Sequence, residues 1–265
     1  MHNLTGLQFV NVELTSMCNK SCFMCGRRKL EKDYPHLAKW GNMPASMAIK
    51  IAHQLPEGIV VAFHNNGDPL MYPDLKQVLP HYKKQIRVLD TNGKMLVQQA
   101  DAIINNLDTI TISVIENDLE GDEQFEIVKK FIGIKQNKKP RMIYRLLGDV
   151  KDAERWYKLP GMVATRILHS PDGSFDYRQK TTVPEIGICL EALTHLAIDR
   201  FGDVSMCVRF DPKREGVIGN ILKNSLEDLW NSKKRKDWIQ KHVLGKRSEI
   251  SLCSKCEFWG IPKGF

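Results

Sequence analysis

The chain has 265 residues, a net charge of +8 and seven cysteines, with 42% hydrophobic and 26% charged residues. This length and balance predict a globular protein with one large domain, or one domain and a small appendage. No apolar run approaches the roughly 20 residues that span a bilayer, and no secretory signal is visible, so we expect neither a membrane span nor export. The thiols favour a reducing, cytoplasmic location.

Apolar runs alternate with helical patterns through the first two thirds of the chain. The runs predict six strands, at 9–14, 58–64, 86–90, 109–114, 141–147 and 162–169. Helices are expected at 44–55, 73–84, 94–105, 122–136 and 152–159, and a long polar loop at 26–43. Such alternation predicts parallel β/α units, whose right-handed connections curl the sheet toward a barrel. Six units are fewer than the eight of a full barrel, so we expect an α/β fold with a partial (β/α)6 TIM-like barrel.

The pattern changes at residues 170–174, where Ser-Pro-Asp-Gly-Ser is rich in turn formers. We therefore predict a barrel core at 1–170, and a linker with a small α+β domain at 171–265. A hairpin with strands at 193–198 and 204–208 is expected there. Its turn contains Gly202, which supplies the positive φ that such a turn favours.

Three cysteines, Cys18, Cys22 and Cys25, follow the first strand with the spacing C-x3-C-x2-C. Three thiolates suit an iron–sulfur cluster that normally takes four ligands, which leaves one iron open for a substrate or cofactor. Chance thiols and a zinc site are the alternatives. No histidine lies between Leu14 and Tyr34, which disfavours a zinc knuckle.

This motif resembles the signature of the radical S-adenosylmethionine (radical SAM) superfamily. The resemblance implies that the cysteines hold a [4Fe–4S] cluster whose open iron binds the amino and carboxylate groups of SAM. An electron from the cluster then cleaves SAM to a 5′-deoxyadenosyl radical. The residue before the third cysteine is usually aromatic and packs near adenine. Here it is Met24, whose polarizable thioether suits similar packing.

Polar residues at the ends of the expected strands resemble the rest of the family's SAM site, which lies at the C-terminal rim of the barrel. The turn after the second strand resembles the Gly-Gly-Glu-Pro motif, with Asn66 for the first glycine and the shorter Asp68 for the glutamate. A plain Asn-Gly turn is the alternative. The resemblance implies SAM contacts from Asn66, Gly67, Asp68, Pro69, Asn92 and Ser113.

Four further residues on this rim are candidates for substrate contact or proton transfer: His64, Glu116, Arg145 and His169. Arg145 shares a strand face with Ile143 and Leu147, where it pairs with an anionic group or forms a surface ion pair. A single histidine is more often structural than catalytic, so these assignments depend on the geometry of the site.

The remaining cysteines are Cys189, Cys207, Cys253 and Cys256. Four thiolates close either a [4Fe–4S] cluster or a structural zinc site. Their arrangement, with the segments 218–220 and 225–230, resembles the Twitch domain, a shortened SPASM domain found after radical SAM cores. The resemblance implies one auxiliary [4Fe–4S] cluster, and so two [4Fe–4S] clusters and SAM in all.

A closed second cluster suits an electron acceptor, so we predict oxidation of a substrate after hydrogen-atom abstraction. The expected substrate is small and polar or anionic, such as a sugar, cyclitol or nucleotide derivative. The first strand begins within ten residues, which leaves no room for a peptide-leader module. A peptide-modifying maturase, an enzyme that modifies a nucleic-acid base, and a non-catalytic iron–sulfur electron-transfer protein remain alternatives.

The basic excess is compatible with a nucleic acid, an anionic substrate or an acidic reducing partner such as a flavodoxin or ferredoxin. The densest basic run, 233–236, lies on an expected helix and forms either a solvated face or a binding surface. Nucleic acid is not favoured, because no binding module is visible.

Overall fold

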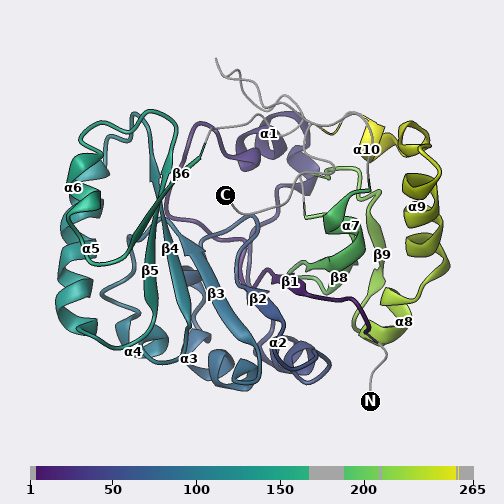
Figure 1. Ribbon diagram of the computed structural model, residues 1–265, viewed down its shortest axis with the longest axis horizontal. Helices are drawn as coiled ribbons and strands as arrows, with labels where there is room; N and C mark the ends of the chain where they lie inside the picture. The colour runs from purple at the N-terminus through teal and green to yellow at the C-terminus, as the bar shows by residue number, and fades with distance from the viewer. Residues whose placement is uncertain (1–3, 167–187, 209–210, 255, 257–265) are drawn as a thin grey trace.

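A single nine-stranded sheet runs through both halves of the computed structural model, which describes residues 4–166, 188–208, 211–254 and 256 (Figure 1). The strand order is β6-β5-β4-β3-β2-β1-β7-β8-β9. The strands are β1 (Phe9–Val12), β2 (Val60–Ala62), β3 (Ile86–Thr91), β4 (Thr109–Ile115), β5 (Arg141–Leu147), β6 (Met162–Arg166), β7 (His195–Ile198), β8 (Asp203–Ser205) and β9 (Val217–Asn220). The six parallel strands from β1 to β6 confirm the predicted α/β fold.

Helices α2 to α6 lie along the outer side of the parallel strands (Figure 1). The α-helices are α1 (Gly26–Asp33), α2 (Ala45–Ala52), α3 (Leu75–Val78), α4 (Ala100–Ile103), α5 (Gly121–Lys135), α6 (Glu154–Tyr157), α7 (Leu190–Thr194), α8 (Leu226–Trp230), α9 (Lys233–Val243) and α10 (Ser251–Ser254). Along β5, Met142, Tyr144 and Leu146 are buried, whereas the intervening residues are more exposed. The two faces of the sheet therefore differ, with the apolar face packed under the helices.

Three expectations from the sequence are corrected. The polar loop at 26–43 contains α1, which is stabilised by ion pairs between Arg28 and Glu31 at 2.9 Å and between Lys29 and Asp33 at 3.2 Å. This helix lacks an apolar stripe, so the hydrophobic pattern does not reveal it. The helix expected at 73–84 divides into α3 and a 3₁₀ turn at Leu79–Tyr82, which contains Pro80. The helix expected at 94–105 is confined to α4, because turns occupy 94–99.

The C-terminal hairpin joins the edge of the barrel sheet. Strand β7 pairs in parallel with β1, from Phe9 opposite His195 to Val12 opposite Ile198, and β8 and β9 continue the sheet in antiparallel order. The predicted hairpin is confirmed, and Gly202 in its turn has a φ of +83°. The carboxyl ends of β1 and β7 consequently meet at one edge of the sheet. The predicted boundary at 170 and 171 lies outside the described residues.

The basic run at 233–236 begins α9, but its members have different environments. Arg235 is buried, and its guanidinium donates to the carbonyl oxygens of Ala192 at 3.2 Å, Leu193 at 2.8 Å and Trp230 at 3.2 Å. The same group stacks 3.3 Å from the centre of the Trp230 ring. Arg235 therefore joins α7, α8 and α9 instead of contributing to a basic surface. Among the described residues, none of the helices has the length and apolar character needed to cross a membrane.

Replacing Arg235 with Met should destabilise the C-terminal region by about 2–4 kcal/mol, because three carbonyl groups lose their donor. The matched control is Lys236→Met on the same helix, where the side chain is exposed. Anaerobic denaturant unfolding of both variants measures the difference. Equal stability of Arg235→Met and Lys236→Met would show that the buried guanidinium does not hold these helices together.

Candidate active site

The cysteine loop lies between β1 and α1, and Cys25 occupies the N-cap position of that helix. The three thiols are free and partly buried. Burial is the main cause that raises the pKa of the Cys22 thiol to about 12, and the neighbouring Cys25 and Cys18 contribute to this shift, so the three sulfurs are close enough to interact. Iron supplies the positive charge that keeps buried sulfurs ionised, and the donor set therefore fits an iron–sulfur cluster.

A cluster also differs from a single-ion site in its geometry. Among the described residues, no three His, Cys, Asp or Glu side chains converge in a group suited to one metal ion. The thiolates of a four-iron cluster each bind a different iron, so they surround the cluster instead of meeting at one point.

Asn92, predicted to contact SAM, holds the cysteine loop in this structure. Its amide nitrogen Nδ2 donates to Asn19 Oδ1 at 2.9 Å and lies 3.9 Å from the sulfur of Cys18. The backbone carbonyl oxygen of Asn92 accepts a hydrogen bond of 2.7 Å from Gln124 Nε2. The same nitrogen donates to the backbone carbonyl oxygen of Ser113 at 2.9 Å. The ends of β3 and β4 are thereby connected to α5 and to the loop.

Asp68 is buried where the turn after β2 meets the end of β3. Its carboxylate accepts hydrogen bonds from Thr91 Oγ1 at 2.8 and 2.9 Å, from Asn92 N at 2.7 Å and from Leu70 N at 3.0 Å. Burial raises the pKa of this carboxyl, although these hydrogen bonds act to lower it. The protein itself therefore uses both carboxylate oxygens to fasten two strand ends. The predicted contact with the SAM amino group stays a prediction.

Gly67 lies against the backbone that leads into the cysteine loop. A Cβ added at Gly67 would stand 2.3 Å from the carbonyl oxygen of Thr15 and 2.6 Å from that of Met17. The next residue, Asp68, donates its N–H to Met17 O at 2.8 Å. Pro69, also predicted at the SAM site, is buried at the start of a 3₁₀ turn. Only glycine fits this close approach of two backbones.

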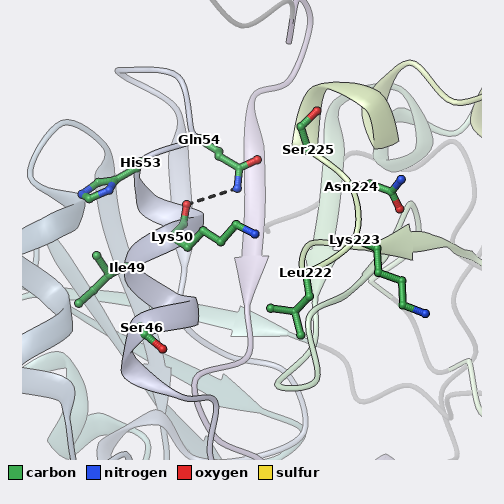
Figure 2. Close-up of a pocket in the computed structure, with 9 residues that line it drawn as sticks. All are labelled: Ser46, Ile49, Lys50, His53, Gln54, Leu222, Lys223, Asn224 and Ser225. Carbon is green, nitrogen blue, oxygen red and sulfur yellow. Dashed lines mark hydrogen bonds between the residues drawn. The ribbon is translucent and has the colours of Figure 1, made fainter.

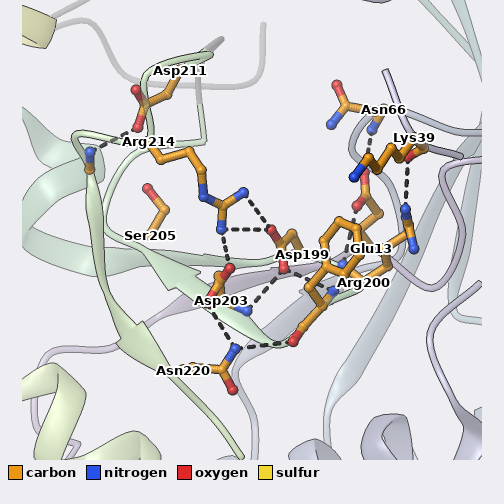
Figure 3. Close-up of polar contacts among 12 residues, drawn as sticks. Glu13, Lys39, Asn66, Asp199, Arg200, Asp203, Ser205, Asp211, Arg214 and Asn220 are labelled. Atoms are coloured by element: carbon orange, nitrogen blue, oxygen red, sulfur yellow. Dashed lines mark hydrogen bonds and ion pairs between the residues drawn. The ribbon is translucent and has the colours of Figure 1, made fainter. Parts of the chain in front are cut away.

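Two residues that the sequence predictions did not include connect these parts; Figure 3 shows the first of them, Glu13. Glu13 is buried just after β1, and its carboxylate accepts from Asn66 N at 3.0 Å and from Arg200 N at 3.2 Å. Arg27, buried on α1, donates to the carbonyl oxygens of Ser16 and Asn66. The sequence offered one signal for Glu13, since it is the charged residue in the predicted strand at 9–14, and charged residues are seldom fully buried without a partner.

A cavity of about 470 Å³ lies between the cysteine loop and the C-terminal hairpin. Cys25 lines it on the loop side and Cys207 on the hairpin side, and the predicted SAM residue Asn66 also lines it. Asp199, Asp203 and Arg214 form an ion-paired wall of this cavity (Figure 3). One residue from each predicted cysteine group therefore borders a single space.

A larger cavity of about 650 Å³ lies between α2 and the turn before α8 (Figure 2). None of the predicted site residues lines it. Lys50 Nζ donates to Ile221 O at 3.0 Å, and Leu226 N donates to Gln54 Oε1 at 2.8 Å, so two of its lining side chains join α2 to the C-terminal region. Size alone does not make this cavity the reaction site.

The structure brings two predicted substrate residues together on the sheet around Asp90. Arg145 Nη1 donates to Asp90 Oδ2 at 2.6 Å, and His64 Nε2 lies 3.8 Å from the same oxygen. Arg145 and nearby His64 both lower the pKa of Asp90, against the effect of its burial. Ser113 is opposite Arg145 in the strand register. Arg145 therefore forms an ion pair within the protein, and its predicted contact with an anionic group stays a prediction.

The other predicted residues lie apart from this group. Glu116 is buried and accepts a bond of 2.6 Å from Asp149 N, which joins the ends of β4 and β5. Met24 is half-buried in the cysteine loop. His169 lies outside the described residues.

Three of the C-terminal cysteines are near one another. Burial is the main cause that raises the pKa of the Cys253 thiol to about 12, and the neighbouring Cys189 and Cys256 contribute to this shift. Arg247 Nη1 donates to the carbonyl oxygen of Cys253 and to that of Cys256, the latter at 3.4 Å, so one guanidinium binds the backbone at both cysteines. Cys207 follows β8 and hydrogen-bonds Ser205 through its backbone. This donor set fits a buried iron–sulfur cluster as well.

Comparisons with known proteins agree with this geometry. Residues 189–257 match the SPASM family model, described as an iron-sulfur cluster-binding domain. Over 254 residues the chain is 23% identical to the S-adenosyl-L-methionine-dependent 2-deoxy-scyllo-inosamine dehydrogenase of Niallia circulans, covering 93% of this chain and 91% of that protein.

Two solved structures share the fold. The structure of BtrN in complex with AdoMet and 2-DOIA has a TM-score of 0.60 and 18% identity, covering 94% of this chain and 92% of the other. Streptococcus suis SuiB bound to S-adenosylmethionine has a TM-score of 0.54 and 15% identity, covering 97% and 73%.

These comparisons support the resemblance to radical SAM enzymes that Cys18, Cys22 and Cys25 indicated, and residues 189–257 match the predicted C-terminal auxiliary-cluster domain. SAM and iron–sulfur clusters, when bound, would supply the radical chemistry of that superfamily. The residues above hold the cysteine loop, the strand ends and the hairpin around the cavity that Cys25 and Cys207 border.

Gly67→Ala should cost about 1–3 kcal/mol of stability and lower the iron bound by the reconstituted protein, because the added methyl group displaces the cysteine-loop backbone. Gly133→Ala on α5 is the matched control, since nothing lies within 4 Å of its added Cβ. That substitution should stabilise the exposed helix by about 0.5–1 kcal/mol. Normal iron content in Gly67→Ala would contradict the close approach.

Proposed function

We propose that this protein is a radical SAM enzyme that oxidises a small polyhydroxylated substrate, with an aminocyclitol as the first candidate. The observation that carries the proposal is the shared cavity, which Cys25 and Cys207 border from opposite sides. A substrate in this space contacts the SAM-binding side of the enzyme and lies beside the auxiliary cysteines. The Niallia circulans relative, which bears the name of a dehydrogenase of 2-deoxy-scyllo-inosamine, supports the same reaction class.

The cavity suits a small polar molecule. Its volume of about 470 Å³ is in the usual range for small-ligand sites, and its lining includes the carboxylates of Asp199, Asp203 and Asp211. Lys39 and Arg200 line the opposite part of the cavity. Positively charged hydrogen-bond donors and negatively charged acceptors therefore line the cavity. Such a lining suits a substrate with several hydroxyl and amino groups.

Oxidation of an alcohol carbon to a carbonyl removes a hydrogen atom, a proton and an electron from the substrate. We propose two [4Fe–4S] clusters, of which the one held by Cys18, Cys22 and Cys25 with SAM supplies the radical and the other accepts the electron. The protein supplies the base. His64 is our candidate, because its ring is next to the buried carboxylate of Asp90, with His64 Nε2 3.8 Å from Asp90 Oδ2, and the adjacent Asn65 lines the cavity.

The remaining features of the proposal concern partners and location. A flavodoxin or ferredoxin is the proposed reductant, and dithionite replaces it in an assay. The seven cysteines, which the structure shows as free thiols, support a reducing cytoplasmic environment. The burial of Arg235 reduces the basic surface at 233–236, which weakens the case for a nucleic-acid substrate.

Cys207→Ala should separate SAM cleavage from substrate oxidation. The variant should still form 5′-deoxyadenosine when incubated anaerobically with dithionite, SAM and 2-deoxy-scyllo-inosamine, or another cyclitol or amino sugar that the unmodified enzyme oxidises. The oxidised product should fall at least about tenfold, because one ligand of the electron acceptor is missing. Chromatography with mass detection measures both products.

Cys18→Ala is the matched control and should abolish both products. Full substrate oxidation by Cys207→Ala would contradict the role of the second cluster. No 5′-deoxyadenosine from the unmodified, iron-loaded enzyme would contradict the proposed function as a whole.

A further inference from the structure

A buried ion pair connects the cysteine loop to the opposite side of the rim. Lys20 lies two residues from both Cys18 and Cys22, and its ammonium pairs with the carboxylate of Asp118 in the loop between β4 and α5. The two side chains are only 7% and 9% exposed. Solvent screening is weak for charges this deeply buried, so each one acts strongly on its surroundings.

The carboxylate of Asp118 is also held by a hydrogen bond at the start of α5. Its Oδ1 accepts a bond of 3.1 Å from Glu120 N, which is the N-cap residue of α5. Glu120 lies 3.7 Å from Lys20 Nζ and pairs with Lys94 Nζ at 2.6 Å. Asp118 is therefore part of a rigid helix start, and Lys20 brings the cysteine loop to it.

This pair acts together with the amide contact of Asn92 described above. Asn19 and Lys20 are adjacent in the loop, and they bind the ends of β3 and β4 respectively. Two successive residues between the first and second cysteines are thus anchored to two different strands. These two contacts together fix the position of the cysteine loop on the rim.

We propose that the Lys20–Asp118 ion pair positions the cysteine loop and sets the charge next to its cluster, and thereby tunes the reduction potential of that cluster. The proposal rests on the cluster assignment in the proposed function. Positive charge near a cluster stabilises its reduced, more negative form, and negative charge opposes reduction. In the intact pair the ammonium and the carboxylate largely offset each other.

The two single variants of the ion pair should shift the midpoint potential of the cluster in opposite directions. Asp118→Asn leaves the ammonium of Lys20 uncompensated, so the midpoint potential should move in the positive direction. Lys20→Met leaves the carboxylate uncompensated, so the potential should move in the negative direction. The double variant removes both charges and should return toward the unmodified value. A purely structural role would not reverse sign between the two single variants.

The measurement is a redox titration of the reconstituted enzyme, followed by electron paramagnetic resonance and made at the same pH for every variant. The signal that changes on addition of SAM identifies the loop cluster. Lys32→Met is the matched control, because Lys32 is an exposed lysine on α1 whose charge is screened by solvent. The midpoint potential of the loop cluster should not move in this variant. Iron content is determined for every variant.

Full iron loading with unchanged potentials, or shifts of the same sign in both single variants, would overturn the proposal. If Lys20→Met and Asp118→Asn lose iron while Lys20→Arg and Lys32→Met keep it, the positioning role is supported. Equal iron loss in Lys32→Met would overturn it. These readouts do not require substrate, so they separate this proposal from a failed substrate assignment. An unmodified enzyme without a cluster at Cys18, Cys22 and Cys25 would contradict the proposed function instead.

Discussion

The parallel pairing of β1 with β7 is the constraint on which the site depends. β1 has β2 on one side and β7 on the other, so it joins the barrel strands to the C-terminal hairpin. The cysteine loop leaves the carboxyl end of β1, and the hairpin turn leaves the same end of β7. Two cysteine groups separated by more than 160 residues therefore border one cavity.

Hydrogen bonds to buried carboxylates hold this edge in place. Glu13 receives one backbone N–H from the turn after β2 and another from the turn after β7. Asp68 fastens the β2 turn to the end of β3. Each such bond contributes about 1 kcal/mol or somewhat more when the acceptor is ionised, and loss of an acceptor leaves buried donors unpaired. These hydrogen bonds thus hold the rim in one shape around the cavity that we propose for the cofactors and the substrate.

Much of this arrangement could be predicted from the sequence. Short runs rich in apolar residues located the six barrel strands, and the observed limits of β5 coincide with the predicted ones. The spacing of Cys18, Cys22 and Cys25 indicated the chemistry, because three thiolates in one loop suit few other sites. These features depend on residues that are near one another in the chain, which is why a sequence pattern reveals them.

Long-range contacts account for what the sequence did not predict. The hydrophobic pattern of 195–198 indicates a strand but does not identify β1 as its neighbour. The carboxylate of Asp68 resembles a ligand group, yet its bonds to Thr91 and Asn92 arise only when two strand ends meet. Likewise, Lys20 pairs with Asp118, which is 98 residues away in the sequence.

The proposed function depends on two iron–sulfur clusters that face one cavity from opposite sides. Anomalous X-ray scattering at the iron and zinc edges, from crystals of the anaerobically reconstituted enzyme, tests this arrangement directly. Two groups of iron are expected, one beside Cys25 and the other beside Cys207, with the cavity between them. Iron at only one of these places, or zinc beside Cys207, would contradict it.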